Sequence, residues 1–270
     1  MARIHKYIVL LTILFACQAR GQQITSTNFH KYSYRIETID SKYSRGNYVD
    51  NGTASILSVR KRLYLVTNYH LLLTRNALTG EYLVDPDFIP DTVRVYFHTK
   101  PNETRIVAQS YPLYDSNGAP QFLTMMLDAT KYCDISVLPI TDIPDTLALY
   151  IINDSIFDST SVSAWPNKKL LFAGFPLANG DSNGYGRVFT ANSIMPPGGI
   201  SPYLFYDTQT EHGMSGSPIF ITDEQAGVLK LIAINAEGPP IGYSPFEYGG
   251  GGIYLKYALE IIGGRAVPVK

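Results

Sequence analysis

The sequence predicts an all-β protein, and three observations point to that fold class. Twenty tyrosines, 22 glycines and 17 prolines among 270 residues favour short strands broken by turns over long helices. Short β-branched or aromatic runs recur along the chain, whereas long helical periodicity is scarce. About 249 residues remain once a leader is removed, which suits one large all-β unit or two small barrels.

The chain opens with features of a secretory leader. A basic segment, Met1–Lys6, precedes the apolar stretch Tyr7–Ala16, which is too short to span a bilayer comfortably. Ala19-Arg20-Gly21 resembles a small-x-small cleavage site. We therefore expect a signal peptide over residues 1–21, a mature chain from Gln22 without a transmembrane span, and a secreted, periplasmic or cell-surface location.

Cys17 leaves a second interpretation of the N-terminal segment open, and it also bears on the pairing of Cys133. Leu14 to Cys17 resembles a bacterial lipobox, apart from Phe15 at its second position, and lipidation of Cys17 would anchor the protein to a membrane. Either way Cys133 has no intrachain disulfide partner. Stability must then come from the hydrophobic cores, with Cys133 as a buried structural thiol.

Five runs are the clearest strand candidates, because β-branched and aromatic residues dominate each of them. In chain order they are Arg62 to Thr67, Thr92 to His98, Lys169 to Ala173, Arg187 to Ala191, and Val228 to Asn235. The first of these runs is followed directly by His70, where we expect the strand to give way to a short helical turn.

Three residues along the chain form a candidate catalytic set. Asp134 lies in a strand-like segment, and Ser215 lies in the loop Gly213 to Pro218. A serine hydroxyl is a weak nucleophile at neutral pH, so catalysis needs a histidine to take its proton and a carboxylate to fix the histidine tautomer. The order His70, Asp134, Ser215 differs from that of subtilisins and of α/β-hydrolases, and Ser217 breaks the G-x-S-x-G pattern of the latter.

With these motifs the chain resembles the trypsin-like serine peptidases, nearest to the bacterial branch of glutamyl endopeptidases and high-temperature-requirement proteases. Its T-N-x-H matches Thr67 to His70, its D-I-[AS]-V strand matches Asp134 to Val137, and its G-x-S-G-S-P loop matches Gly213 to Pro218. Weaker echoes are Gly174 to Pro176 and Gly252 to Tyr257.

The resemblance implies a chymotrypsin-like double barrel of two six-stranded antiparallel β-barrels with a short C-terminal helix. We place the first barrel, carrying His70 and Asp134, at residues 22–145, and the second, carrying Ser215, at residues 146–270. It also implies a serine endopeptidase that acts on polypeptides. His70 would remove the proton of Ser215, Asp134 would hold the imidazole, and the backbone N–H groups of Gly213 and Ser215 would bind the oxyanion.

Alignment with the glutamyl endopeptidases implies a substrate-binding set beside Ser215. Its members are Gln209, Thr210, Asn235, Ala236, Glu237 and Gly238. Residues 236–238 would pair with the substrate as an added strand. Asn235 stands where those enzymes carry the histidine that meets an acidic side chain, so a glutamate preference is not implied.

Composition excludes several other function classes. Loss of residues 1–21 removes three basic residues and no acid, which takes the formal net charge from −1 to −4. A mildly acidic chain without a basic run gives no support for nucleic-acid binding. No Walker loop, HExxH helix or paired CxxC is present, so we expect neither a cofactor nor a catalytic metal.

One departure from the animal digestive enzymes bears on regulation. They carry an aspartate just before the nucleophile, which pairs with a new N-terminus after activation cleavage, whereas this chain carries Met214, which cannot form an ion pair. We therefore expect no such activation step.

Two alternatives to the peptidase function stay open. One is a catalytically silent trypsin-like homologue that binds a peptide or protein partner. The other is a surface β-protein in which the motif is coincidental.

Overall fold

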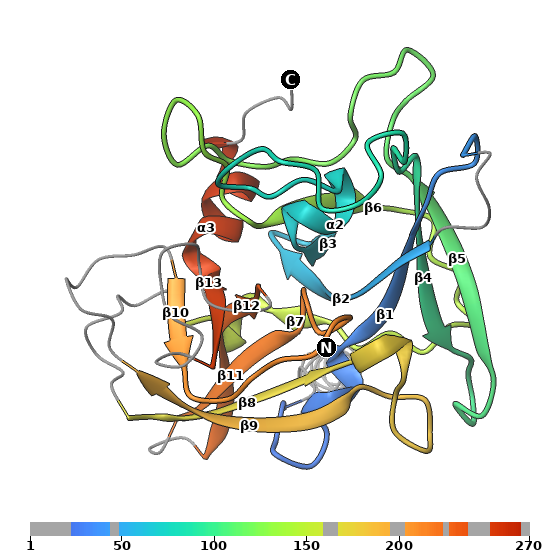
Figure 1. Cartoon of the computed structure of the whole chain (residues 1–270). Helices are drawn as coiled ribbons and strands as arrows, with labels where there is room; N and C mark the ends of the chain where they lie inside the picture. Colours follow the sequence, from blue (N-terminus) through green and yellow to red (C-terminus); the bar gives the residue numbers. More distant parts are fainter. Residues whose placement is uncertain are drawn as a thin grey trace, which may run out of the picture.

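The structure is a computed structural model in which two β units pack side by side (Figure 1). It describes residues 23–43, 49–158, 167–194, 203–223, 227–236 and 249–265. The predicted leader at residues 1–21, with Cys17, lies outside these residues, as do Glu237 and Gly238. No helix among the described residues has the length and hydropathy needed to cross a membrane.

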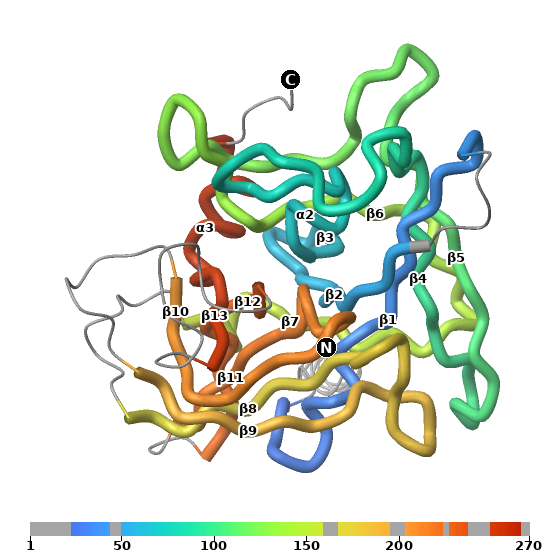
Figure 2. Tube along the Cα trace, viewed as in Figure 1, coloured from blue at the N-terminus to red at the C-terminus, as the bar shows by residue number. Residues whose placement is uncertain are grey.

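The first unit is a seven-stranded sheet. Its strands are β1 (Tyr34–Ile39), β2 (Val49–Val59), β3 (Arg62–Thr67), β4 (Thr92–His98), β5 (Ile106–Pro112), β6 (Ser136–Ile140) and the short β7 (Ile152–Asn153). Six of them run antiparallel in the order β5-β4-β1-β2-β3-β6, and β7 pairs with β2 in parallel. The sheet curls into a half-barrel, because its strands twist and one face is buried, as the Cα trace shows (Figure 2).

The second unit is a closed barrel in the order β10-β13-β12-β11-β8-β9. Its strands are β8 (Lys169–Gly174), β9 (Arg187–Ile194), β10 (Tyr203–Tyr206), β11 (Pro218–Asp223), β12 (Val228–Asn235) and β13 (Gly250–Tyr254). Closure gives every strand two hydrogen-bonded neighbours, so the barrel has no free edge.

Helical segments are short and lie at the ends of strands. They are η1 (Phe29–Tyr32), α2 (Tyr69–Leu73), η2 (Asp154–Ile156), η4 (Pro176–Ala178), α3 (Leu255–Glu260) and η5 (Ile261–Arg265). Two of them matter for the site, because α2 follows β3 directly and η4 follows β8 directly.

The cores follow from alternation along the strands. In β4 the side chains of Val93, Val95 and Phe97 are buried, while the intervening residues are partly exposed. One continuous apolar cluster includes Phe97 of the first unit together with Phe220 and Ile253 of the second. The two units therefore share a hydrophobic interface and pack as one body.

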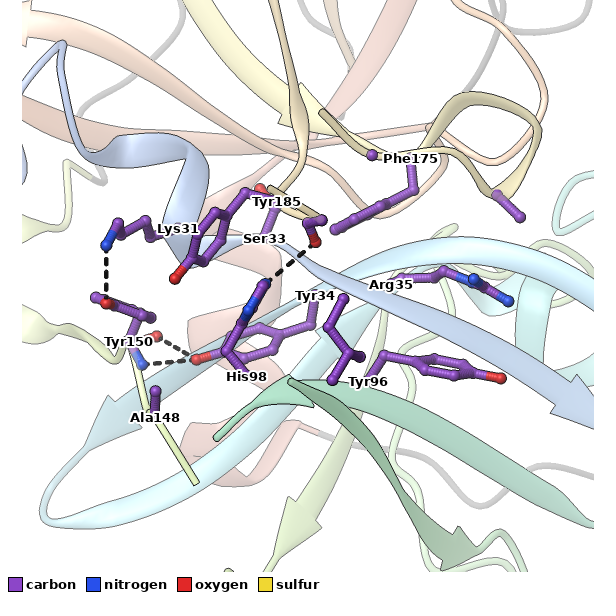
Figure 3. A pocket seen from close by; sticks show the side chains of 14 residues that line it. Lys31, Ser33, Tyr34, Arg35, Tyr96, His98, Ala148, Tyr150, Phe175 and Tyr185 are labelled. Carbon is purple, nitrogen blue, oxygen red and sulfur yellow. Dashed lines mark hydrogen bonds between the residues drawn. The ribbon is translucent and has the colours of Figure 1, made fainter. Parts of the chain in front are cut away.

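Polar groups also cross this interface. We call Lys31, Glu103, Tyr150 and Tyr185 the seam cluster, and three of them surround a cavity between the units (Figure 3). The ammonium of Lys31 donates to Glu103 Oε2 at 2.8 Å and to the Tyr150 hydroxyl at 3.1 Å, and it lies 4.9 Å from the centre of the Tyr185 ring. Both tyrosine hydroxyls donate to the Glu103 carboxylate.

The predicted fold class is confirmed: the chain is all-β, with a closed six-stranded barrel, a half-barrel and a short C-terminal helix. The five predicted strands coincide with β3, β4, β8, β9 and β12. Asp134 precedes its strand, because β6 begins only at Ser136. The unit boundary at residues 145 and 146 stays a prediction, although β7, beyond it, pairs with the first sheet.

Candidate active site

The His70 ring lies within hydrogen-bonding distance of both Asp134 and Ser215. His70 Nδ1 is 2.9 Å from Asp134 Oδ2 and 3.0 Å from its Oδ1, while His70 Nε2 is 3.1 Å from Ser215 Oγ. The histidine comes from α2 of the first unit, and the serine from the loop between β10 and β11 of the second. The carboxylate can only accept, so it fixes the proton on Nδ1 and leaves Nε2 as the acceptor facing the serine.

The chain around His70 fixes this orientation. β3 ends at Thr67, and extended Asn68 (φ −84°, ψ 152°) turns the chain into α2. The Asn68 side-chain amide donates to the Asp134 carbonyl at 2.7 Å, and the His70 backbone N–H donates to Asp134 Oδ1 at 3.0 Å. Asp134 is buried, so its carboxylate acts on His70 with little screening from water.

The loop from Gly213 to Pro218, which we call the nucleophile loop after the role predicted for Ser215, requires its glycines. Met214 N–H donates to the Glu211 carbonyl at 3.1 Å, and Gly213 has φ +91°, as the third position of a type II turn demands. Gly216 has φ +88°, and a Cβ there would lie 1.8 Å from the Thr53 carbonyl oxygen. Only glycine fits this conformation and this close approach.

The Met214 carbonyl in this loop accepts two side-chain hydrogen bonds. The Met214 carbonyl accepts from the side-chain amide of Asn235 at 2.9 Å and from the Ser217 hydroxyl at 2.6 Å. Since the only cis peptide among the described residues precedes Pro101, the Ser215 N–H points away from these donors. The Met214 side chain is fully buried in the core of the second barrel.

The predicted substrate-binding residues are placed unequally. Gln209 is exposed, and Thr210 and Ala236 are partly buried. Asn235 is fully buried, with its amide bound to the Met214 carbonyl and to the Tyr206 hydroxyl. This amide supports the nucleophile loop from behind, and substrate contact by these four residues stays a prediction.

Other residues near the site carry no sequence signal. Asp50 of β2 lies with a carboxylate oxygen 3.4 Å from Nε2 of His212, whose side chain is 57% exposed beside Gly213. Thr53, also in β2, donates its backbone N–H to the Ser215 carbonyl at 2.7 Å. Neither position belongs to a motif, and only the packing of β2 against the second unit brings them here.

Cys133, next to Asp134, is fully buried and forms no disulfide. Burial, and then the nearby carboxylate of Asp134, raises the pKa of its thiol well above the ordinary value. The thiol therefore stays neutral and unreactive, as the sequence predicted for a structural cysteine. No cluster of three or more potential metal ligands is present within the part of the chain that the structure describes.

Known proteins resemble this chain in structure and not in sequence. No family model matches it, and no curated protein matches it. A thermostable serine protease, AL20, from an extremophilic microorganism aligns with a TM-score of 0.51 at 12% identity over 86% of this chain and 94% of its own.

Two further solved structures agree. The protease Anisep from Arthrobacter nicotinovorans gives a TM-score of 0.52 at 12% identity, covering 91% of this chain and 98% of its own. The scabies mite inactivated protease paralogue S-I1 gives 0.50 at 12% identity, covering 90% and 96%. The chain thus has the chymotrypsin-like fold of serine proteases.

Proposed function

We propose that this protein is a secreted serine endopeptidase that hydrolyses peptide bonds through Ser215, His70 and Asp134. The observation that carries the proposal is the continuous chain of hydrogen bonds from the Asp134 carboxylate through the His70 ring to the Ser215 hydroxyl. It joins residues from both units of a serine-protease fold.

In the acylation step the Ser215 hydroxyl attacks the carbonyl carbon of the peptide, and its proton moves to His70 Nε2. The carbonyl oxygen becomes an oxyanion, which accepts hydrogen bonds from the N–H groups of Gly213 and Ser215. Asp134 stabilises the imidazolium formed on His70. When the carbon–nitrogen bond breaks, the imidazolium gives its proton to the leaving amine, and the acyl group stays on Ser215.

In the deacylation step water takes the place of the leaving amine. His70 removes a proton from water, the hydroxide attacks the ester carbonyl, and the Ser215 oxygen leaves with the proton that His70 returns. The polypeptide substrate would lie against Gln209 and Thr210, and it would pair as an added strand with the segment from Ala236 to Gly238. Export of the mature chain through the segment at residues 1–21 belongs to the same proposal.

The proposal is tested by labelling the purified mature protein with a fluorophosphonate, which phosphonylates an activated serine with loss of fluoride. We expect a single adduct on Ser215 in the wild type and none in Ser215→Ala or His70→Ala. The matched control is Ser182→Ala, an exposed serine in a turn, which keeps full labelling. Hydrolysis of a casein substrate by the same samples is expected to follow the labelling.

A folded wild-type protein that takes no label would contradict the proposal. It would favour the silent homologue, a reading that the fold alone does not separate from an enzyme, because the scabies mite protein is described as an inactivated paralogue. Binding of a peptide or protein partner would then be the next property to measure.

A further inference from the structure

We propose that Thr53 is a positioning residue that sets the oxyanion-binding shape of the nucleophile loop from the opposite unit. The inference rests on the proposed function and deepens it. Thr53 lies in β2 of the first unit, 160 residues before Gly213, and it is completely buried.

The Thr53 hydroxyl binds two segments of the second unit at once. It donates to the Gly213 carbonyl at 2.8 Å, and it accepts the backbone N–H of Phe175 at 3.1 Å. The backbone carbonyl of Thr53 accepts a hydrogen bond from the Thr67 hydroxyl at 2.7 Å, which holds Thr53 in place. One hydroxyl therefore uses both its donor and an acceptor position at the junction of the two units.

The first of these bonds fixes the peptide between Gly213 and Met214. This peptide stands between the two peptide units whose N–H groups, on Gly213 and Ser215, would bind the oxyanion. With its carbonyl held by Thr53, its N–H points to the other side, where it donates to the Glu211 carbonyl. A rotation of this peptide would turn the neighbouring N–H groups, so the Thr53 hydroxyl opposes a collapse of the oxyanion hole.

The second bond acts through η4. Phe175 leads into this segment, in which Leu177 (φ 50°) and Ala178 (φ 62°) both adopt the left-handed conformation that side chains disfavour. In this conformation the Leu177 N–H donates to the His212 carbonyl at 2.7 Å. The His212 carbonyl and the Gly213 N–H belong to the same peptide bond, which is trans. The Gly213 N–H is therefore directed away from η4.

The Thr53 hydroxyl is thus the common partner of two supports of Gly213. It binds the Gly213 carbonyl directly, and it anchors the start of the segment whose Leu177 binds the preceding carbonyl. A Cβ on Gly213 would lie 2.5 Å from the Phe175 carbonyl oxygen, so the loop and η4 are packed in contact. A change at Thr53 is expected to loosen both supports together.

The test compares Thr53→Val, which keeps the shape and removes the hydroxyl, with Thr53→Ser, which keeps the hydroxyl. For p-nitrophenyl acetate we expect Thr53→Val to lower kcat about 10- to 100-fold with KM within about twofold, less than the loss of a whole oxyanion donor. Fluorophosphonate labelling is expected to slow to the same degree. Thr53→Ser is expected to stay within about threefold of the wild type.

The matched control is Ser33→Ala. The Ser33 hydroxyl is also buried and also donates from the first unit to a carbonyl of the second, that of Ala173 at 2.8 Å, but among the described residues no hydrogen bond joins it to the nucleophile loop. We expect kcat to stay within about twofold, since only interface stability is lost. An equal loss of kcat in Ser33→Ala and Thr53→Val would overturn the inference, because a general loosening would then explain both.

Hydrogen exchange provides a readout that does not depend on activity. In Thr53→Val the amides of residues 211–217 are expected to exchange at least about tenfold faster than in the wild type, with no such change in Ser33→Ala. If Thr53→Val does not fold, Thr53→Ala, which removes the same hydroxyl with less bulk, takes its place. Exchange and kcat at wild-type values in a folded variant would overturn the inference.

The two proposals fail in different ways. A wild-type protein that takes no label and hydrolyses no ester contradicts the proposed function, whatever the exchange rates are. A reactive wild-type protein whose hydroxyl-free Thr53 variants react equally fast contradicts only the role of Thr53.

Discussion

At the scale of single residues, Asp134 has the most sharply defined task in the site. Its carboxylate faces His70 Nδ1 with both oxygens, at 3.0 and 2.9 Å, and it also binds the His70 backbone N–H. An asparagine of the same shape would offer an NH₂ group to the ring. That group donates to Nδ1, so the ring proton moves to Nε2. Nε2 can then no longer accept the hydrogen bond from the Ser215 hydroxyl.

We therefore expect Asp134→Asn to keep the fold and to lower kcat by roughly four orders of magnitude, the loss known for this substitution in triads of this type. The measurement is steady-state hydrolysis, with circular dichroism to verify folding. Asp128→Asn is the control, because Asp128 is an exposed aspartate of the preceding loop, outside the site. A kcat within tenfold of the wild type would show that Asp134 does not set the tautomer.

Members of the candidate site could be predicted from the sequence where they belong to a recognisable motif. His70, Asp134 and Ser215 each stand in a short pattern, and the structure brings them together. Thr53 could not be found in this way, because a threonine in a strand is ordinary, and its importance arises from a partner 160 residues away. Leu177 was equally hidden, since its left-handed backbone is imposed by tertiary contacts and not by its side chain.

At the scale of elements, the seam cluster ties η1 and the segment before β7 to the loop between η4 and β9. Burial alone would raise the pKa of Glu103, but hydrogen bonds from Lys31 and Tyr150 outweigh it, so its pKa lies below the ordinary 4.5. For Lys31, burial alone would lower the pKa, and the same contacts raise it above 10.5. The depressed carboxyl pKa contributes stability above the ordinary value, and this is lost as pH falls through the folded-state pKa.

We expect Glu103→Gln to lower the free energy of unfolding by about 1–2 kcal/mol at pH 7, and by less at pH 3, on the acid side of the ordinary glutamate pKa. Urea denaturation at both pH values measures it, provided the wild type still unfolds cooperatively at the lower one. Glu81→Gln, at an exposed glutamate outside the cluster, is expected to change stability by less than about 0.5 kcal/mol. A difference that is the same at both pH values would contradict the charge-based account.

The strands themselves were the most predictable elements. Runs such as Arg62–Thr67 and Val228–Asn235 match β3 and β12 residue for residue, because runs rich in β-branched and aromatic residues leave a clear local signal. β7 left none, since two residues paired to β2 are too few to show a pattern. The position of Asp134 before β6 was missed because apolar residues around it extend the strand pattern beyond the ladder.

At the scale of the whole molecule, the nucleophile loop is held by neutral groups. Met214 is buried among apolar side chains, and its carbonyl is bound by Asn235 and Ser217. No ion pair with a chain terminus is needed to stabilise the loop in this arrangement. The active shape is therefore expected to form as soon as the chain folds.

We expect the mature chain from Gln22 to react with a fluorophosphonate without internal trimming. An uncleavable ten-residue extension placed before Gln22 is expected to leave the labelling rate within about twofold, whereas an enzyme that depends on a free N-terminus would lose nearly all of it. Mass spectrometry verifies that each sample is intact. A chain that stays inert until it is cut would contradict this prediction.

The bond from the Thr53 N–H to the Ser215 carbonyl means that the line between the two units passes directly behind the nucleophile. His70 and Asp134 lie on one side of this line and Ser215 on the other. A shift of one unit against the other by about an ångström would leave every strand intact. It would nevertheless separate the Ser215 hydroxyl, the proton donor, from His70 Nε2, the acceptor. Under mild heat or low denaturant, we expect kcat to fall while the circular dichroism signal of the strands is still unchanged. Activity is then a more sensitive measure of how the two units pack than secondary structure is.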